Sequence, residues 1–204
     1  GYPLEHTRSP QMHNAAFDAL GLNFCYVPLP TAPTDLAKAL DGLAALGFVG
    51  VNVTIPHKQA VIAHLDELSD EARAIGAVNT IVFANGRRIG YNTDGLGFLR
   101  ALTDCGFSVA GRHALVLGAG GAARAVVYTL LQAGATVTVL NRTEAKAVSL
   151  ADDLRGYVCS NVRDEPGVNS LSNNMAVVVR GSALTAGQVA ALAAEVDLVV
   201  NATS

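Results

Sequence analysis

The sequence predicts an α/β protein with two domains, each built around its own sheet. Short apolar runs alternate with stretches of helical periodicity along most of the 204 residues. In the first half, two strand-like runs flank Asn85-Gly86, which is a strong signal for a tight β-hairpin. In the second half, a glycine-rich turn at residues 118–124 joins an apolar run to a helical stretch. We therefore expect a mixed α/β domain at residues 1–95 and a Rossmann-type domain with a parallel sheet at residues 96–204.

The elements of the first half follow from apolar spacing and from the residues that interrupt it. Ser9-Pro10 begins a helix that Gly21 ends, because proline suits the first helical turn and glycine suits the position after the last. A hairpin is expected from the two runs around Asn85-Gly86. The other predictions are strands at 24–29 and 50–55, helices at 36–46, 56–65, 69–75 and 95–105, and hairpin strands at 80–84 and 87–92.

The second half is expected to be a regular β-α-β unit up to about residue 153. Its predicted elements are strands at 114–117, 136–140, 175–179 and 196–200, helices at 125–131 and 186–195, and a polar surface loop at 160–174. A doubly wound sheet rarely ends on a strand without a covering helix. We therefore expect further chain after Ser204, so the Rossmann-type domain is incomplete at its C-terminal end.

Composition excludes several classes of protein. Half of the residues are hydrophobic and 15% are charged, which supplies a packed core. A formal charge of −3 without a basic run gives no electrostatic support for a nucleic-acid or membrane partner, and no uncharged run is long enough to span a bilayer. Three widely spaced cysteines argue against a disulfide framework and against a metal site. A reducing cytoplasm fits this use of cysteine best.

The glycine-rich turn predicts a binding site for a dinucleotide. Gly118 permits a tight turn, Gly120 lets phosphates approach the backbone, and Ala123 allows close packing of helix and strand. The N-terminus of the helix then presents free N–H groups to an anion. The plainer alternative is an ordinary strand-to-helix turn. The predicted cofactor residues of this turn are Gly118, Ala119, Gly120, Gly121 and Ala122.

The end of the next strand favours NADP over NAD. NAD enzymes usually carry an acidic residue there for the ribose hydroxyls, whereas this chain has Asn141-Arg142-Thr143. The Arg142 guanidinium suits a ribose 2′-phosphate, and Thr143 and Lys146 add donors. The alternative is that Arg142 and Lys146 are solvated charges at a helix start, a position slightly unfavourable for cations.

Two clusters of polar residues lie near the beginning and the middle of the first half of the chain. Thr7 and Ser9 stand at a helix start and could hold a carboxylate, although Ser9 could also simply cap the helix. Asn52 and Thr54 share one side of a strand end by alternation. Lys58 follows in the first turn of a helix, which is unfavourable for a cation and suits an acid/base lysine better than a structural one.

A third cluster flanks the predicted hairpin. Asn79 precedes the first strand, and Asp94 follows the second. A hairpin brings its two ends together, so Asn79 and Asp94 can face one cleft. Asp94 could equally cap the helix that follows it.

These strings together closely resemble the shikimate dehydrogenase family. The matching strings, in order, are Ser-Pro-x-Met-His-Asn at 9–14, Asn-Val-Thr-Ile-Pro-His-Lys at 52–58, Gly-Ala-Val-Asn-Thr at 76–80, Asn-Thr-Asp-Gly at 92–95, the glycine turn at 118–124, Asn-Arg-Thr at 141–143 and Asn-Ala-Thr-Ser at 201–204. Two positions depart from the family pattern, because Thr7 stands where serine is usual and Lys146 where many members have arginine.

The resemblance implies a cytoplasmic enzyme, a monomer or homodimer, of the chorismate and aromatic amino-acid pathway. Such an enzyme reversibly reduces 3-dehydroshikimate to shikimate with NADPH and needs no metal. The resemblance also makes Lys58 the acid/base group and Asp94 its catalytic partner. It implies that Thr7 and Ser9 bind the substrate carboxylate, that Asn52, Thr54 and Asn79 bind ring hydroxyls, and that Thr203 lies at the cofactor.

Two alternatives to this function remain open from the sequence. One is a quinate/shikimate dehydrogenase that uses NAD, against which Arg142 argues. The other is a non-catalytic shikimate-binding module, should the chain end at Ser204; retention of both Lys58 and Asp94 argues against it.

Overall fold

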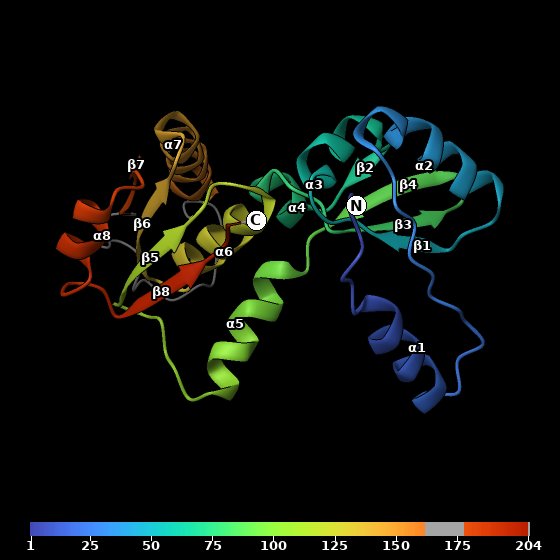
Figure 1. The fold of residues 1–204 in the computed structure, drawn as a ribbon, viewed down its shortest axis with the longest axis horizontal. Helices are drawn as coiled ribbons and strands as arrows, with labels where there is room; N and C mark the ends of the chain where they lie inside the picture. The colour runs from blue at the N-terminus through green and yellow to red at the C-terminus, as the bar shows by residue number, and fades with distance from the viewer. Residues whose placement is uncertain (162–177, 204) are drawn as a thin grey trace.

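The computed structural model describes residues 1–161 and 178–203 and contains two four-stranded sheets (Figure 1). The first sheet has the order β1-β3-β4-β2 and belongs to the N-terminal part of the chain. The second has the order β7-β6-β5-β8 and belongs to the C-terminal part. Helix α4 (Asp70–Ile75) lies between the two parts, and α5 (Asp94–Asp104) connects them. The predicted α/β architecture is confirmed.

The first sheet is mixed, as the sequence predicts. The strands β3 (Thr80–Ala84) and β4 (Arg87–Tyr91) form an antiparallel hairpin around Asn85-Gly86, both of which have positive φ angles. The strand β1 (Gly50–Asn52) pairs antiparallel with β3, and β2 (Glu67–Leu68) pairs parallel with β4. A buried cluster including Leu40, Val61 and Ile81 holds α2 (Leu36–Ala45) and the turn after α3 (His57–Ala60) against this sheet.

The helices of the N-terminal part largely follow the predicted positions. The expected helix from Pro56 to residue 65 is divided into an α-helical turn and a 3₁₀ turn, because the backbone tightens at Val61. Ser69 caps α4 by accepting a hydrogen bond of 3.1 Å from the Ala72 N–H. The elements are α1 (Ser9–Ala19), η1 (Pro33–Asp35), α2 (Leu36–Ala45), α3 (His57–Ala60), η2 (Val61–His64) and α4.

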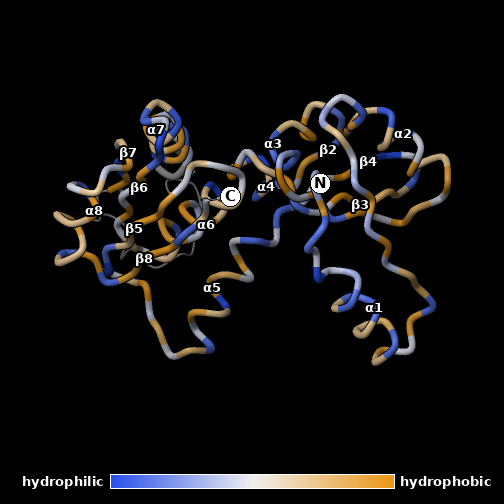
Figure 2. The backbone as a smooth tube through the Cα atoms, in the orientation of Figure 1, coloured by the Kyte–Doolittle hydropathy of each residue, from blue (hydrophilic) through white to orange (hydrophobic). Residues whose placement is uncertain are grey.

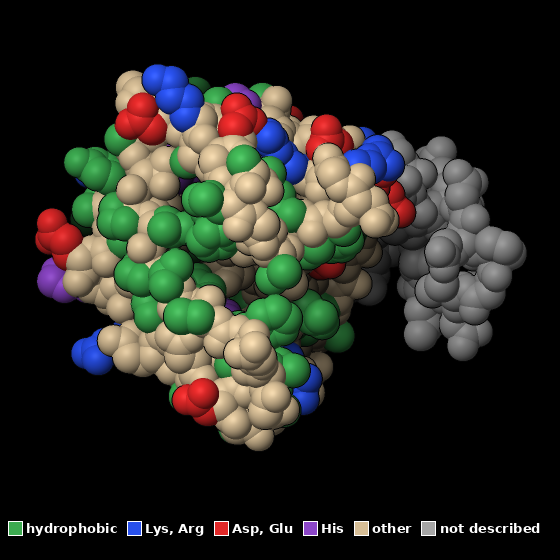
Figure 3. Space-filling view, turned by 90° about the vertical axis from the view of Figure 1, so that its right-hand side faces the viewer, with side chains coloured by type: hydrophobic (Ala, Val, Ile, Leu, Met, Phe, Trp, Pro, Cys, Tyr) green, Lys and Arg blue, Asp and Glu red, His purple; other side chains and the backbone are tan. Residues whose placement is uncertain are grey.

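The prediction of a strand at residues 24–29 is wrong. These residues form no ladder with a neighbouring strand. Instead, the amide side chain of Asn14 accepts a hydrogen bond from the Tyr26 N–H at 2.7 Å and donates one to the Tyr26 carbonyl at 3.0 Å. At Tyr26, a side chain thus supplies the partners that a neighbouring strand would have supplied. Figure 3 shows patches of hydrophobic side chains on this end of the molecule. Phe24 and Val49 of the N-terminal part are exposed.

The second sheet is entirely parallel and has the Rossmann arrangement. The strands β5 (His113–Leu117) and β6 (Thr136–Asn141) lie at its centre, and β5 is hydrophobic along most of its length (Figure 2). Helix α6 (Gly121–Gln132) begins at the glycine turn and buries Ala123, Val127 and Leu130. The remaining elements are α7 (Glu144–Asn161), β7 (Val179–Ala183), α8 (Ala186–Leu192) and β8 (Leu198–Asn201).

Several boundaries in the second half differ from the predicted ones. Helix α7 extends through Asn161, so the loop predicted at 160–174 begins inside the helix, and residues 162–174 lie outside the described residues. The strand predicted at 175–179 lies mostly outside them too, and β7 begins at Val179. Helix α8 stops at Leu192, three residues before its predicted end. Polar and small residues blur the apolar periodicity in this region.

Candidate active site

Lys58 and Asp94 form an ion pair where α3 and α5 begin. The Lys58 ammonium contacts the Oδ2 atom of Asp94, and the two side chains are 13% and 28% exposed. The other carboxylate oxygen, Oδ1, accepts a hydrogen bond of 2.8 Å from Nδ2 of Asn79. The two oxygens of Asp94 therefore have different donors, and the carboxylate is held in one orientation.

Asn79 is the centre of this polar network. Its buried side chain donates from Nδ2 to Thr93 Oγ1 at 2.9 Å as well as to Asp94, and its Oδ1 accepts from the Thr93 N–H at 3.0 Å. Thr80 Oγ1 also donates to Asn79 Oδ1 at 2.9 Å and itself accepts from Asn52 Nδ2 at 3.2 Å. A continuous series of hydrogen bonds thus runs from Asn52 through Thr80, Asn79 and Asp94 to Lys58.

The β-hairpin explains why Asn79 and Asp94 meet. The Asn79 N–H donates to the Tyr91 carbonyl at 3.0 Å, immediately before the paired residues Thr80 and Tyr91. Asn92 then donates to the Ala77 carbonyl at 2.9 Å and accepts from the Asp94 N–H at 3.0 Å. The expectation that the hairpin brings Asn79 and Asp94 together is confirmed. The alternative that Asp94 caps α5 is wrong, because Thr93 occupies the cap position.

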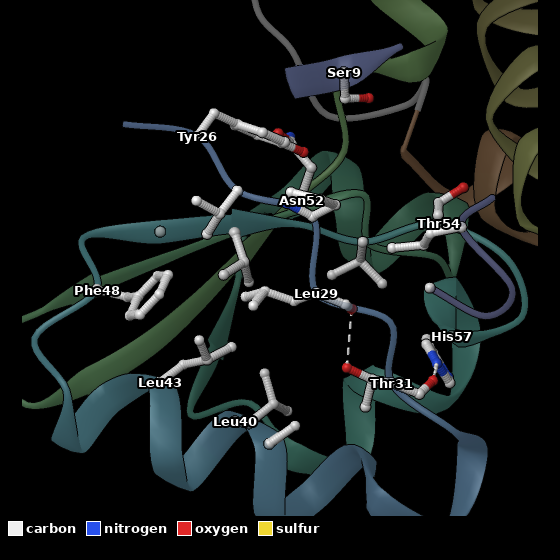
Figure 4. A pocket seen from close by; sticks show the side chains of 18 of the residues that line it. Ser9, Tyr26, Leu29, Thr31, Leu40, Leu43, Phe48, Asn52, Thr54 and His57 are labelled. Carbon is white, nitrogen blue, oxygen red and sulfur yellow. Dashed lines mark hydrogen bonds between the residues drawn. The ribbon is translucent and has the colours of Figure 1, made fainter. Parts of the chain in front are cut away.

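A cavity of about 150 Å³ lies between β1 and the segment before α2. It is lined by Thr7, Ser9, Asn52 and Thr54, among other residues. Figure 4 shows Ser9 and Thr54 on the side opposite Leu40 and Leu43. Ser9 is the first residue of α1, not its cap, because Arg8 occupies the cap position and makes no side-chain cap bond. The Ser9 N–H instead donates to Thr7 Oγ1 at 3.3 Å.

Tyr26 is a residue of this cavity that the sequence analysis missed. Its ring stacks on the His13 ring with centroids 4.3 Å apart. Burial raises the pKa of the Tyr26 phenol, and a hydrogen bond with the Ser9 side chain lowers it by a smaller amount. The phenol therefore stays protonated beside Ser9. No sequence signal shows this, because the Asn14 contacts that place Tyr26 span a non-local distance in the chain.

A larger cleft, of about 680 Å³, lies between the two sheets. Gly118, at its base, has φ +110°, and a Cβ there would lie 2.7 Å from the Ala202 carbonyl oxygen. A Cβ on Gly121 would lie 2.8 Å from Lys58 Cβ, so the glycine turn directly touches the lysine. Every predicted cofactor residue lines this cleft together with Lys58: Gly118, Ala119, Gly120, Gly121, Ala122, Asn141, Arg142, Thr143, Lys146 and Thr203.

The charges in this cleft suit a ligand with phosphate groups. Arg142 and Lys146 are exposed, and neither makes an ion pair within residues 1–161 and 178–203. Asn141 Nδ2 donates to the Thr143 carbonyl at 2.9 Å and shapes the turn that carries Arg142. The open surface at Gly120, where no atom lies within 4 Å of an added Cβ, leaves room at the start of α6. Gln59 and Arg124 also line the cleft and were not among the predicted residues.

Metal-binding clusters and membrane-spanning helices do not occur in the part of the chain that the structure describes. No group of three or more His, Cys, Asp or Glu side chains that could bind a metal ion is present there. None of the helices there combines the length and the apolar character needed to cross a bilayer.

Comparisons with known proteins agree with this geometry. Residues 1–81 match the shikimate dehydrogenase substrate binding domain, and residues 101–189 match shikimate / quinate 5-dehydrogenase. Shikimate dehydrogenase (NADP(+)) of Geobacter metallireducens is 45% identical over 197 residues, which are 93% of this chain and 69% of that protein. The chain belongs to the shikimate dehydrogenase family. The family assignment made from the sequence motifs is thereby confirmed.

Other members of the shikimate dehydrogenase family show how much of the protein is matched. Shikimate dehydrogenase (NADP(+)) of Carboxydothermus hydrogenoformans is 58% identical over 156 residues, 76% of this chain and 56% of that protein. The crystal structure of shikimate 5-dehydrogenase from Thermus thermophilus, in complex with NADP(H) and shikimate, superimposes with a TM-score of 0.79 at 40% identity. The match covers 100% of this chain and 66% of that one. The chain thus spans about half to two thirds of the length of these relatives.

Proposed function

We propose that this chain provides the catalytic and cofactor-binding parts of an NADP-dependent shikimate dehydrogenase. The enzyme reversibly reduces 3-dehydroshikimate to shikimate in the chorismate and aromatic amino-acid pathway, in the cytoplasm, as a monomer or homodimer. The observation that carries the proposal is the position of Lys58. It is paired with Asp94 and lies against Gly121, at the junction of the polar network and the phosphate-suited cleft.

The chemistry requires a hydride and a proton to reach the two ends of a ketone bond. Bound NADPH supplies the hydride to the carbonyl carbon. Negative charge then develops on the oxygen, where the Lys58 ammonium stabilises it and donates the proton. In the reverse direction, neutral Lys58 accepts the hydroxyl proton. The ammonium has three N–H bonds and uses one on Asp94, so donors remain for the substrate oxygen.

Asp94 and Asn79 orient the lysine in this proposal. The Asp94 carboxylate stabilises the charged ammonium and is itself kept in place by Asn79. Both N–H bonds of the Asn79 amide are used on Thr93 and Asp94, so Asn79 orders the network. We propose that it also contacts a ring hydroxyl of the substrate. We propose that Asn52 and Thr54 contact hydroxyls and that Thr7 and Ser9 bind the substrate carboxylate.

The proposed cofactor residues divide into backbone and side-chain donors. Residues of the glycine turn present N–H groups and open space to the pyrophosphate, which requires close approach of the backbone. Arg142, Thr143 and Lys146 would contact a ribose 2′-phosphate, and the lack of a carboxylate at the end of β6 removes the repulsion that this phosphate would otherwise meet. We also propose the domain division at residues 95 and 96, within the first turn of α5.

The test is reduction of NADP⁺ by the complete natural polypeptide with shikimate, followed by nicotinamide absorbance. Parallel assays replace NADP⁺ with NAD⁺ and shikimate with quinate. Rapid reduction with NADP⁺ and shikimate is expected. Equal rates with NAD⁺ and turnover of quinate would favour the NAD-dependent quinate/shikimate enzyme. Shikimate binding measured by calorimetry without any turnover would favour the non-catalytic module.

A further inference from the structure

Arg124 reaches from the cofactor side of the molecule to the helix that precedes the catalytic network. It lies in the first turn of α6, and its side chain is only 12% exposed. Its Nε donates to the Ile75 carbonyl at 2.5 Å, at the end of α4, and its Nη1 pairs with Asp153 of α7 at 3.0 Å. A single guanidinium thus joins three helices from the two parts of the chain.

The contact between Arg124 and α4 is tightly packed. Gly76, which follows α4, has φ +68°, and a Cβ there would lie 2.9 Å from Nη2 of Arg124. Beside it, the buried side chains of Ile75, Ala77 and Ala125 form a separate small core across the two parts. Close packing on this scale resists small displacements, since any shift opens a void or a clash.

The segment held by Arg124 leads directly to the catalytic residues. Within four residues of Ile75, the Ala77 carbonyl accepts from Asn92, and the Val78 N–H donates to the Lys58 carbonyl at 2.7 Å. Asn79, the next residue, orients Asp94. A displacement of the Ile75 carbonyl is therefore transmitted to the backbone of Lys58 and to the amide of Asn79.

The position of Arg124 is electrostatically unfavourable. A cation in the first turn of a helix is opposed by the helix dipole. Its ion-pair partner Asp153 is 52% exposed, so that pair adds little stability. The planar fork, with Nε on Ile75, Nη1 on Asp153 and Nη2 against Gly76, is a geometry that lysine cannot reproduce.

We propose that Arg124 is a positioning residue for the dehydrogenase reaction. It holds segment 75–79 in register with the glycine turn and so sets the placement of Lys58 and Asp94 relative to the cofactor. The inference rests on the proposed function for its catalytic consequence. Arg124 also lines the cofactor cleft, so direct binding of a cofactor phosphate is the competing role that the experiment must separate.

The experiment compares Arg124→Gln with Arg155→Gln in the complete natural polypeptide. Arg155 is a matched control, because it also joins an aspartate, Asp152, and a backbone carbonyl, that of Val179, but all these residues lie in the C-terminal part. For Arg124→Gln we expect kcat to fall about 10- to 100-fold, because small misplacements of catalytic groups cause losses of this size. The Kd values for NADP⁺ and shikimate should stay within about threefold. Arg124→Lys should recover part of kcat.

Amide hydrogen exchange supplies a readout that does not depend on activity. The Val78 and Asn79 amides should exchange roughly tenfold faster in Arg124→Gln than in the native protein, because a hydrogen bond to a charged group has been lost. Arg155→Gln should leave their exchange unchanged. If the native protein fails to reduce NADP⁺ with shikimate, the proposed function is wrong, while this measurement still decides whether Arg124 holds the segment.

Three outcomes would overturn the proposal. The first is a kcat of Arg124→Gln within about twofold of the native value, because misplaced catalytic groups should lower kcat by more than that. The second is an equal loss of kcat in Arg155→Gln, which would indicate general destabilisation. The third is a raised Kd for NADP⁺ with kcat unchanged, which would make Arg124 a cofactor-binding residue instead.

Discussion

The two sides of the cleft are built in different ways. On the N-terminal side, a network of side chains forms the site, and Asn79 alone makes hydrogen bonds to Thr80, Thr93 and Asp94. On the C-terminal side, the glycine turn offers backbone and open space, supported by the buried strands β5 and β6. A site made of side chains depends on the functional groups of those side chains. A site made of backbone N–H groups depends on the absence of bulky side chains that would keep a ligand away. Substitutions on the N-terminal side should therefore remove functional groups, whereas substitutions in the glycine turn should introduce steric conflict.

The largest effect is expected from Lys58→Met, which keeps most of the length of the side chain and removes its ammonium group. We expect kcat to fall by about 10² to 10⁴, the usual contribution of a placed acid/base group. Binding of NADP⁺, measured by fluorescence titration, should be little changed. The control is Lys38→Met, at an exposed position on α2. Similar losses in both variants would contradict the role of Lys58.

Asn79→Ala should damage both activity and stability. It leaves Asp94 and Thr93 without their buried partner, which costs about 1–3 kcal/mol of unfolding free energy. Loss of orientation should lower kcat by about 10- to 100-fold. Urea unfolding and steady-state kinetics measure the two effects, with exposed Asn23→Ala as the control. Full activity in Asn79→Ala would show that Lys58 and Asp94 orient one another unaided.

Arg142→Gln tests the cofactor side through a side chain. We expect KM for NADP⁺ to rise about tenfold, since one charge-assisted contact to the 2′-phosphate is lost. KM for NAD⁺, which lacks that phosphate, should change less than about twofold by the same argument. The control is Arg100→Gln, at an exposed position on α5. An equal rise for both cofactors would place Arg142 elsewhere than at the 2′-phosphate.

Gly121→Ala tests the point where the two sides touch. The added Cβ would lie 2.8 Å from Lys58 Cβ, so either Lys58 or the glycine turn must shift. A fall in kcat of less than about tenfold is expected. Gly97→Ala, in the interior of α5 with no atom within 4 Å of the new Cβ, should instead raise stability by about 0.5–1 kcal/mol. Unchanged kinetics in Gly121→Ala would show that the contact can relax freely.

The smallest effect concerns the pH dependence of stability at the edge of the second sheet. The backbone N–H of His113 and the Arg112 guanidinium lower the pKa of Asp197, with hydrogen bonds of 2.9 and 2.7 Å. A lowered carboxyl pKa stabilises the fold above the unfolded pKa, and this stabilisation is lost as pH falls through the folded pKa. Asp197→Asn should therefore have a slightly lower Tm than the native protein at neutral pH. Thermal melts should show the difference disappearing in acid; a constant difference would contradict the assignment.

Local patterns determined much of this molecule by themselves. The hairpin at Asn85-Gly86, the helix start at Ser9-Pro10 and the glycine turn at Gly118 were predictable, because each depends on a few adjacent residues with restricted backbone conformations. The juxtaposition of Asn79 and Asp94 was also predictable, since the hairpin between them converts a sequence separation into a contact. The family followed from the order of the motifs.

Only the tertiary structure decided the contacts between distant segments. Residues 24–29 have a strand-like composition, yet they pair with no strand, and the Asn14 side chain makes both backbone hydrogen bonds of Tyr26. Tyr26 lines the cavity beside Ser9, and Arg124 donates to the Ile75 carbonyl. Both contacts also join residues that are far apart in the sequence. Such contacts depend on how elements pack in three dimensions, and a side chain's partner across that packing leaves no periodic trace in the sequence.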